Sequence, residues 1–171
     1  RLLVEVEPDG RSNWSELMAT LARTLKPRAR GAEPGMSLSE LRMIGGTITV
    51  TEAARGISEE LSGVELSFAW PSIARSFGAT GRFTWHDESF DASANLIDLI
   101  AAVSGERSGL KLRLAGAPFK LAFDGNISQR PSLKLEGTLA ADGKSLREAL
   151  RWASRQPLPG SGFGPFAIKA Q

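Results

Sequence analysis

Apolar and polar residues alternate almost without fault between Gly109 and Gly125. Successive side chains of a β-strand point to opposite faces, so this alternation predicts strands with one apolar face and one polar face. Apolar side chains take every second position before and after a turn at Gly116–Pro118, namely Leu110, Leu112, Leu114, Phe119, Leu121 and Phe123. The pattern therefore predicts a β-hairpin that is apolar on one side only.

The same one-sided alternation recurs along most of the chain. Val64, Leu66, Phe68 and Trp70 share one face of a predicted strand that ends at Pro71. Further strands are predicted over 2–7, 78–85, 89–96, 132–139 and 166–170. In the predicted strands over 78–85 and 89–96, Phe83 and Trp85 share one face, as do Phe90 and Leu96. Together with the two strands predicted over 38–52, the pattern gives about nine or ten strands, nearly all of them one-sided.

Within residues 38–52, the Gly45–Gly46 pair has the form of a two-residue hairpin turn. Glycine is favoured in such turns because they require positive φ angles. We therefore expect two strands joined at this pair.

Three short helices are predicted between the strands, over 12–25, 96–103 and 145–154. Asn13 followed by Glu16, and Ser145 followed by Glu148, have the spacing of a capping box at a helix start. The helices are too few to cover a sheet of this size. The excess apolar face must therefore either close on itself, as in a flattened barrel or sandwich, or remain open as a groove.

Composition agrees with one globular domain over residues 1–171. Apolar residues make up 42% and charged residues 23% of the chain, and the formal net charge of +2 gives no argument for nucleic acid binding. Cysteine is absent, which excludes disulfides and thiolate chemistry. The chain begins without Met and already in a strand-like pattern, so we expect a soluble fragment of a longer protein.

The search for catalytic or metal-binding residues gives no candidate. The single histidine, His86, falls in the predicted hairpin loop over 86–89, where we interpret it as a solvated turn residue. One histidine without cysteine is a poor ligand set for a metal. Several aspartates, such as Asp124 and Asp142, directly precede glycine, as is typical of turns. We therefore expect neither an enzyme nor a bound cofactor or metal.

Five segments in succession resemble the AsmA-like family of bacterial envelope proteins. These are an Asn-Trp helix start, a Gly-Gly segment, a Trp-Pro strand end, a Phe-Asp-Gly strand and the closing segment, at Asp9–Trp14, Leu38–Gly56, Val64–Trp85, Ala117–Ser128 and Ser145–Phe166. The resemblance spans nearly the whole chain. No catalytic motif accompanies it.

The resemblance implies a fold, a location and a function. It implies a long β-groove in the periplasm, held at the inner membrane by an anchor outside this chain, that guides phospholipid or another envelope lipid between the inner and outer membranes. We thus expect a β-dominated α+β domain with a curved antiparallel sheet of hairpins and two or three short helices. The expected lipid-binding residues are Phe68, Trp70, Phe83, Trp85, Leu112, Leu114, Phe119, Leu121 and Phe123.

A second interpretation is a scaffold that contacts envelope proteins, such as outer-membrane proteins during assembly. Exposed strand edges or basic residues would form its contact surface. The basic candidates are Lys26, Arg28 and Arg30 in one loop and Arg147, Arg151 and Arg155 on the last predicted helix.

Overall fold

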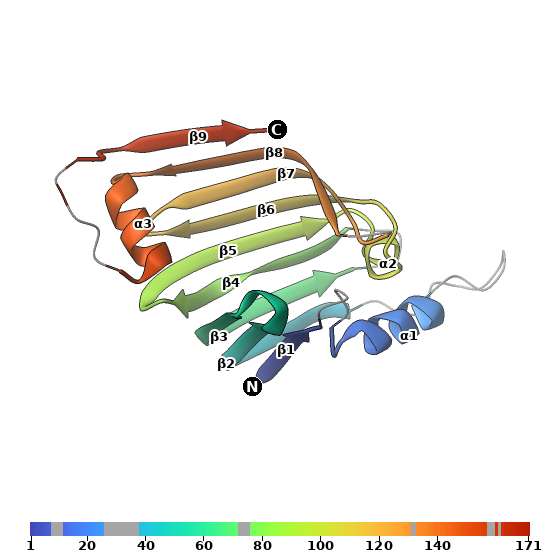
Figure 1. Ribbon diagram of the computed structural model, residues 1–171. Coiled ribbons are helices and arrows are strands. Elements are labelled where there is room, and N and C mark those ends of the chain that lie inside the picture. The colour runs from blue at the N-terminus through green and yellow to red at the C-terminus, as the bar shows by residue number, and fades with distance from the viewer. Residues whose placement is uncertain (8–11, 26–37, 72–75, 131–132, 157–159, 161) are drawn as a thin grey trace.

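A computed structural model describes residues 1–7, 12–25, 38–71, 76–130, 133–156, 160 and 162–171 (Figure 1). The strands are β1 (Leu2–Val6), β2 (Leu38–Glu52), β3 (Ile57–Trp70), β4 (Phe77–Trp85), β5 (Glu88–Leu96), β6 (Ser108–Gly116), β7 (Lys120–Ser128), β8 (Lys134–Gly143) and β9 (Phe166–Ala170). The helices are α1 (Ser15–Leu25), α2 (Leu99–Val103) and α3 (Leu146–Ser154), with a single 3-10 turn at Ala53–Arg55. The loop that carries Lys26, Arg28 and Arg30 lies outside the described residues.

All nine strands form one sheet in the order of the sequence, from β1 to β9. The β1–β2 pair is parallel, and every other neighbouring pair is antiparallel. The sheet is curved and open, and its two ends, β1 and β9, do not meet (Figure 1). The predicted β-dominated α+β fold is thus confirmed. Of the two outcomes left open by the sequence, the sheet is a groove and not a closed sandwich.

The helices lie at the two ends of the strands. α3 lies where the β4–β5 and β6–β7 hairpins turn, whereas α2, with α1 in contact with it, lies at the opposite end (Figure 1). Ser145 caps α3 as predicted, because its hydroxyl accepts a hydrogen bond from the backbone N–H of Glu148 at 3.3 Å. Among the described helices, none has the length and apolarity needed to cross a membrane.

Asn13 does not cap α1, so that prediction was wrong. Its side chain bonds to strand β1 instead, donating from Nδ2 to the Leu3 carbonyl at 3.0 Å and accepting from the Glu5 N–H at 3.0 Å. The Asn13 N–H donates to the Glu5 carbonyl at 3.1 Å, and the Trp14 indole donates to the Leu3 carbonyl at 2.6 Å. Asn13 and Trp14 therefore form hydrogen bonds with backbone groups of β1, at the edge of the sheet.

The Gly45–Gly46 pair is not a turn, and residues 38–52 form the single long strand β2. The pairing of β2 with β3 shifts register around Gly46, and Gly45 has a φ of 62°. A second shift, between β3 and β4, lies beside Gly63, whose φ is 55°. Glycines with positive φ mark β-bulges, which bend a strand locally. The glycine pair thus bends the strand where the sequence had predicted a chain reversal.

Glycines also allow close backbone contact on the hollow side of the sheet. Gly125 of β7 faces Gly137 of β8. A methyl group at Gly125 would overlap the Glu136 carbonyl oxygen and lie 2.7 Å from the Gly137 Cα atom. Such close approach is typical of glycine at bends in a sheet. These positions accommodate the curvature that forms the groove.

Candidate functional site

Two uninterrupted rows of apolar residues cross the sheet from β2 to β9. They follow from the strand register, because residues paired across neighbouring strands point to the same face. The first row is Leu41, Phe68, Ala79, Ala94, Leu112, Phe123, Leu139 and Ala170. The second row is Met43, Leu66, Gly81, Ala92, Leu114, Leu121, Ala141 and Ile168. Eight strands spaced about 4.8 Å apart make each row about 34 Å long.

The opposite face carries polar residues between the same strands. On each strand, the residue between the two row positions points to the other face. These intervening residues include Arg42, Ser67, Thr80, Ser93, Arg113 and Lys169. Ion pairs of 3.0 Å (Arg82–Asp91) and 2.9 Å (Lys111–Asp124) join neighbouring strands with well-exposed side chains. The sheet is therefore strongly one-sided, as the alternation predicted.

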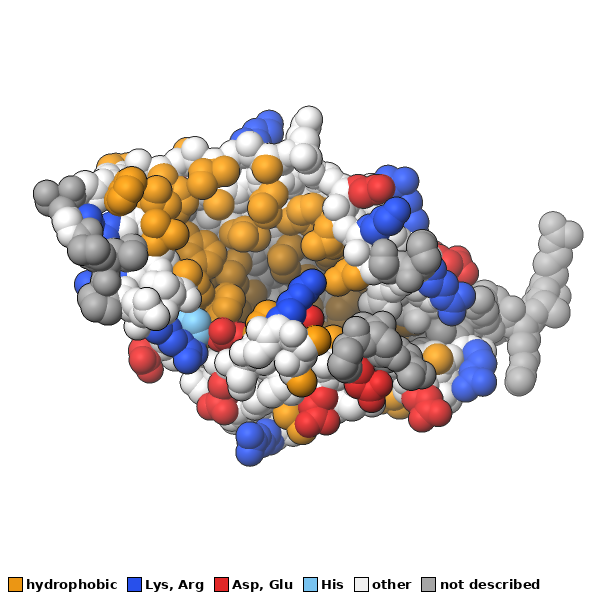
Figure 2. Space-filling view, in the orientation of Figure 1, with side chains coloured by type: hydrophobic (Ala, Val, Ile, Leu, Met, Phe, Trp, Pro, Cys, Tyr) orange, Lys and Arg blue, Asp and Glu red, His pale blue; other side chains and the backbone are white. Residues whose placement is uncertain are grey.

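The protein leaves much of the apolar face uncovered. Among the hydrophobic side chains whose burial the structure describes, those that are buried are Val64, Trp70, Phe90 and Pro118. Within the two rows, Leu41 and Ile168 are each 56% exposed, and Leu112 is 36% exposed. Figure 2 shows a hollow lined by hydrophobic side chains over this face. We call this surface, defined by the two rows, the groove.

Side-chain size varies along the groove in a definite order. The β2 and β3 positions hold leucine, methionine and phenylalanine, and those of β6 and β7 hold leucine and phenylalanine. Between them, β4 and β5 contribute only Ala79, Gly81, Ala92 and Ala94. These two strands therefore form a band of small side chains between the bulky ones of the neighbouring strands.

One end of the groove is closed by an aromatic cluster of Trp85, Phe90, Phe119 and Trp152. The ring centroid of Trp152, in α3, lies 4.8 Å from that of Trp85, 5.3 Å from that of Phe90 and 5.2 Å from that of Phe119. Its indole N–H donates to the Trp85 carbonyl at 3.2 Å. Phe90, beneath these rings, is fully buried. The cluster therefore holds α3 against the end of the sheet.

His86 is part of this attachment and is not solvated, so that prediction was wrong. It lies in a two-residue turn with Asp87, as both positive φ angles show, yet its side chain is only 8% exposed. Its Nδ1 lies 3.2 Å from the Trp152 carbonyl oxygen and its Nε2 lies 2.6 Å from Glu59 Oε2. Both partner atoms are acceptors, so only the imidazolium form can donate to both at once.

Glu59 of β3 receives several donors at one carboxylate oxygen. Trp85 Nε1 donates to Oε2 at 2.8 Å, and Arg155 Nη2 lies 3.7 Å from the same oxygen. Burial acts to raise the pKa of Glu59, but the hydrogen bonds from Trp85 and His86, with the charges of His86 and Arg155, outweigh burial and lower it. The Glu59 carboxylate therefore links β3, the β4–β5 turn and the end of α3.

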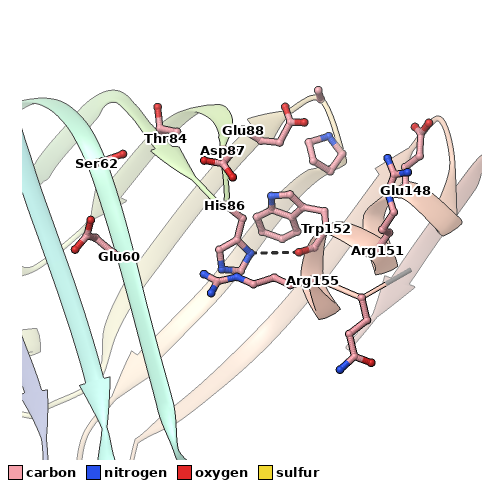
Figure 3. A pocket seen from close by; sticks show the side chains of 13 residues that line it. Glu60, Ser62, Thr84, His86, Asp87, Glu88, Glu148, Arg151, Trp152 and Arg155 are labelled. Atoms are coloured by element: carbon pink, nitrogen blue, oxygen red, sulfur yellow. Dashed lines mark hydrogen bonds between the residues drawn. The ribbon is translucent and has the colours of Figure 1, made fainter. Parts of the chain in front are cut away.

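A polar cleft of about 920 Å³ lies beside the aromatic cluster. Its walls are the β4–β5 turn, with Asp87 and Glu88, and helix α3, with Arg151 and Arg155 (Figure 3). Glu60 and Ser62 of β3 add to the lining. Trp152 lines the cleft as well as contacting the cluster. Within the described part of the chain, no group of His, Asp and Glu residues could hold a metal ion.

The structure places the nine predicted lipid-binding residues in three settings. Phe68, Leu112, Leu114, Leu121 and Phe123 belong to the two rows of the groove. Phe83, Trp85 and Phe119 pack in or against the aromatic cluster, and Trp70 is buried at the end of β3 with 4% exposure.

The remaining row positions were not among the predicted lipid-binding residues. Four of them, Leu41, Met43, Leu139 and Ile168, could be assigned to the rows only once the pairing of their strands was known. The alanines and glycine of β4 and β5 are too small to stand out in a hydrophobic pattern. Their alternation with polar residues was the one available signal.

Comparison with known proteins gives no relative: no family model, characterised protein or solved structure matches the chain.

Proposed function

We propose that the protein binds the acyl chains of a lipid in the groove non-covalently. The observation that carries this proposal is the pair of apolar rows, unbroken across eight strands and left open by the chain itself. Soluble proteins rarely leave so large a continuous apolar surface without a ligand or partner.

The energetics of acyl-chain burial favour such a guest. Moving a methylene group from water to an apolar surface stabilises the bound state by about 0.8 kcal/mol. A chain lying along a row of about 34 Å would bury many such groups. Hydrophobic contact alone is sufficient for capture, so a small number of polar contacts at one end would decide orientation and selectivity.

The resemblance to AsmA-like proteins supplies a biological setting for this proposal. In that setting the protein is a non-enzymatic segment in the periplasm, joined to the inner membrane by an anchor, that guides phospholipid toward the outer membrane. The curved open sheet agrees with the groove that the resemblance implies.

Two matched variants test the proposal. Leu121→Glu places a charge in the groove, whereas Ala122→Glu places the same charge at the next residue, on the opposite face. We expect delipidated wild-type protein and the Ala122 variant to take up fluorescent phospholipid, and the Leu121 variant to lose uptake. Equal uptake by both variants, or none by the wild type, would contradict acyl binding in the groove.

A second pair of measurements guards against misfolding of a charged variant. Ala94→Phe places a bulky side chain in the first row of the groove without adding charge and should lower lipid uptake. A photo-crosslinking residue at Leu121 should capture acyl chains, and the same residue at Ala122 should not. Failure of both results in a folded protein, checked by circular dichroism, would exclude the groove as the binding surface.

A further inference from the structure

Helix α3 is held at its two ends by different kinds of contact. At its first turn, the Leu146 N–H donates to the Gly164 carbonyl at 3.0 Å. At its last turn, the Trp152 ring packs into the aromatic cluster and the Trp152 carbonyl oxygen lies 3.2 Å from His86 Nδ1. No residue of α3 is buried, so the position of its last turn depends on the contacts of Trp152. We call the contact between His86 and the Trp152 carbonyl the latch.

The latch is a hydrogen bond only while the imidazole is charged (Figure 3). Nε2 lies 2.6 Å from the Glu59 carboxylate, and a neutral imidazole, with one N–H, keeps this shorter bond to the charged oxygen. Nδ1 then presents a lone pair to the Trp152 carbonyl oxygen at 3.2 Å. The His86 side chain is only 8% exposed, so solvent screens little of this repulsion. Loss of one proton therefore converts the latch from an attractive contact into a repulsive one.

Charged groups face His86 from each element packed against it. Glu59 of β3 accepts from the imidazole, and Arg155, at the end of α3, lies 3.7 Å from the same carboxylate oxygen. The other charged residues of the polar cleft that His86 lines are Glu60, Asp87, Glu88, Glu148 and Arg151. The carboxylates and the negative end of the α3 dipole favour the imidazolium, whereas burial and the two guanidinium groups oppose it.

The last turn of α3 lies where the groove ends. Phe90 is on the same face of β5 as Ala92 of the second row, two residues away, yet it is fully buried. The rings of Trp85, Phe119 and Trp152 surround it. Of these, Trp152 is the one carried by a helix with no buried residue. Movement of the last turn would withdraw the Trp152 ring and uncover Phe90, which would extend the open apolar face.

We infer that α3 is a pH-sensitive gate at this end of the groove, closed while His86 is charged and released when His86 is neutral, an inference that rests on the function proposed above. The last turn moves away while the first turn stays bound to Gly164. An ordinary imidazole changes charge between about pH 5 and pH 8, so the gate closes at the acidic end of this range and opens at the other. The pKa of Glu59 is lowered, so Glu59 stays ionised throughout.

The test follows the imidazole, the helix and lipid uptake in the same protein from pH 5.5 to pH 8.5. The chain has one histidine, so the NMR signal of its Cε1 proton reports the midpoint of the His86 titration. The protection of the α3 amides over 151–154 against hydrogen exchange, corrected for intrinsic rates, should fall about tenfold through that midpoint, because a hydrogen bond from a charged group is lost. The uptake rate of fluorescent phosphatidylcholine, whose own charge is constant over this range, should rise with the same midpoint.

Variants of His86 separate its charge from its packing. His86→Gln cannot become charged and should give low protection of α3 and fast uptake at every pH. His86→Lys keeps a positive donor and should give high protection and slow uptake even at pH 8.5. Glu88→Gln removes a carboxylate from the same cleft and is the matched control, which should retain the pH transition. Circular dichroism checks that each variant is folded.

The outcomes separate the gate from the proposed function. Protection of α3 that does not change through the His86 midpoint would contradict the latch. Loosening of α3 with a constant rate of lipid uptake would mean that α3 does not gate the groove. If the protein takes up no lipid at any pH, the proposed function fails and the gate with it, whereas the protection of α3, measured without lipid, still tests the latch.

Discussion

The Nε2 atom of His86 lies 2.6 Å from the Oε2 atom of Glu59, and the other ring nitrogen lies 3.2 Å from the Trp152 carbonyl oxygen. A single imidazole thus connects β3, the β4–β5 turn and α3. Helix α3 has no buried residue of its own, so its position depends on this connection and on the aromatic cluster. Both can be tested by substitution.

Acid should weaken the attachment of α3 through Glu59. The folded-state pKa of Glu59 is lower than its ordinary value, because donors and positive charges outweigh burial. Ionised Glu59 therefore stabilises the fold above its unfolded-state pKa, and this contribution is lost as the pH falls through the folded-state pKa. Thermal denaturation between pH 7 and pH 3 should show a smaller loss of Tm on acidification for Glu59→Gln than for wild type. Glu60→Gln, the exposed neighbour, should follow the wild type; identical curves for all three proteins would contradict the role of Glu59.

Removing the indole of Trp152 should destabilise the protein. Truncation of a buried tryptophan costs about 3–5 kcal/mol, and because Trp152 is half-buried we expect about 2–3 kcal/mol from urea denaturation of Trp152→Ala. Leu150→Ala on the same helix, where the side chain is 43% exposed, serves as the control. It should cost much less, and equal losses would mean that the cluster does not anchor α3.

A methyl group at Gly125 should disturb the bend between β7 and β8. It would overlap the Glu136 carbonyl oxygen, which is backbone and has little freedom to move. We expect Gly125→Ala to lower the free energy of unfolding by about 1–3 kcal/mol, as other overpacked sites do. Gly164→Ala, with no atom within 4 Å of the added methyl, should be neutral. A neutral Gly125 variant would show that the curvature tolerates a wider spacing.

Asn13→Ala should loosen strand β1. The substitution removes two side-chain hydrogen bonds, to Leu3 and from Glu5. Hydrogen exchange of the Glu5 amide should accelerate about fivefold, because net hydrogen-bond contributions are about 1 kcal/mol. Asn95→Ala, which removes a 3.3 Å hydrogen bond to Ser76, should leave Glu5 unchanged. Unchanged exchange in the Asn13 variant would mean that the main-chain bond of Asn13 suffices.

The apolar face of strands such as β6 and β7 could be predicted from sequence, whereas the bends and the attachments could not. Alternation is a local property, so residues such as Leu112 and Leu121 were assigned to the apolar face correctly. The Gly45–Gly46 pair fits a turn and a bulge equally well, because both use positive φ. Only the pairing of β2 with β3 decides between them.

Long-range contacts account for the two other wrong predictions. Asn13 has the spacing of a helix cap, yet its amide matches the free backbone groups of β1, which lie close only after folding. His86 sits in a turn that is exposed in most hairpins, but α3 arrives from a distant part of the chain and covers it. The polar cleft was likewise out of reach, since its two walls come from separate parts of the sequence.

The engagement of β1 by Asn13 and Trp14 also bears on how copies of this protein can associate. Copies can join edge to edge into an unlimited filament only if both edge strands of every copy have free backbone N–H and C=O groups. On the β1 flank, the Leu3 and Glu5 backbone groups are already taken by the chain itself. Edge-to-edge growth is therefore opposed on that side, which gives the sheet a polarity and protects it against fibre formation.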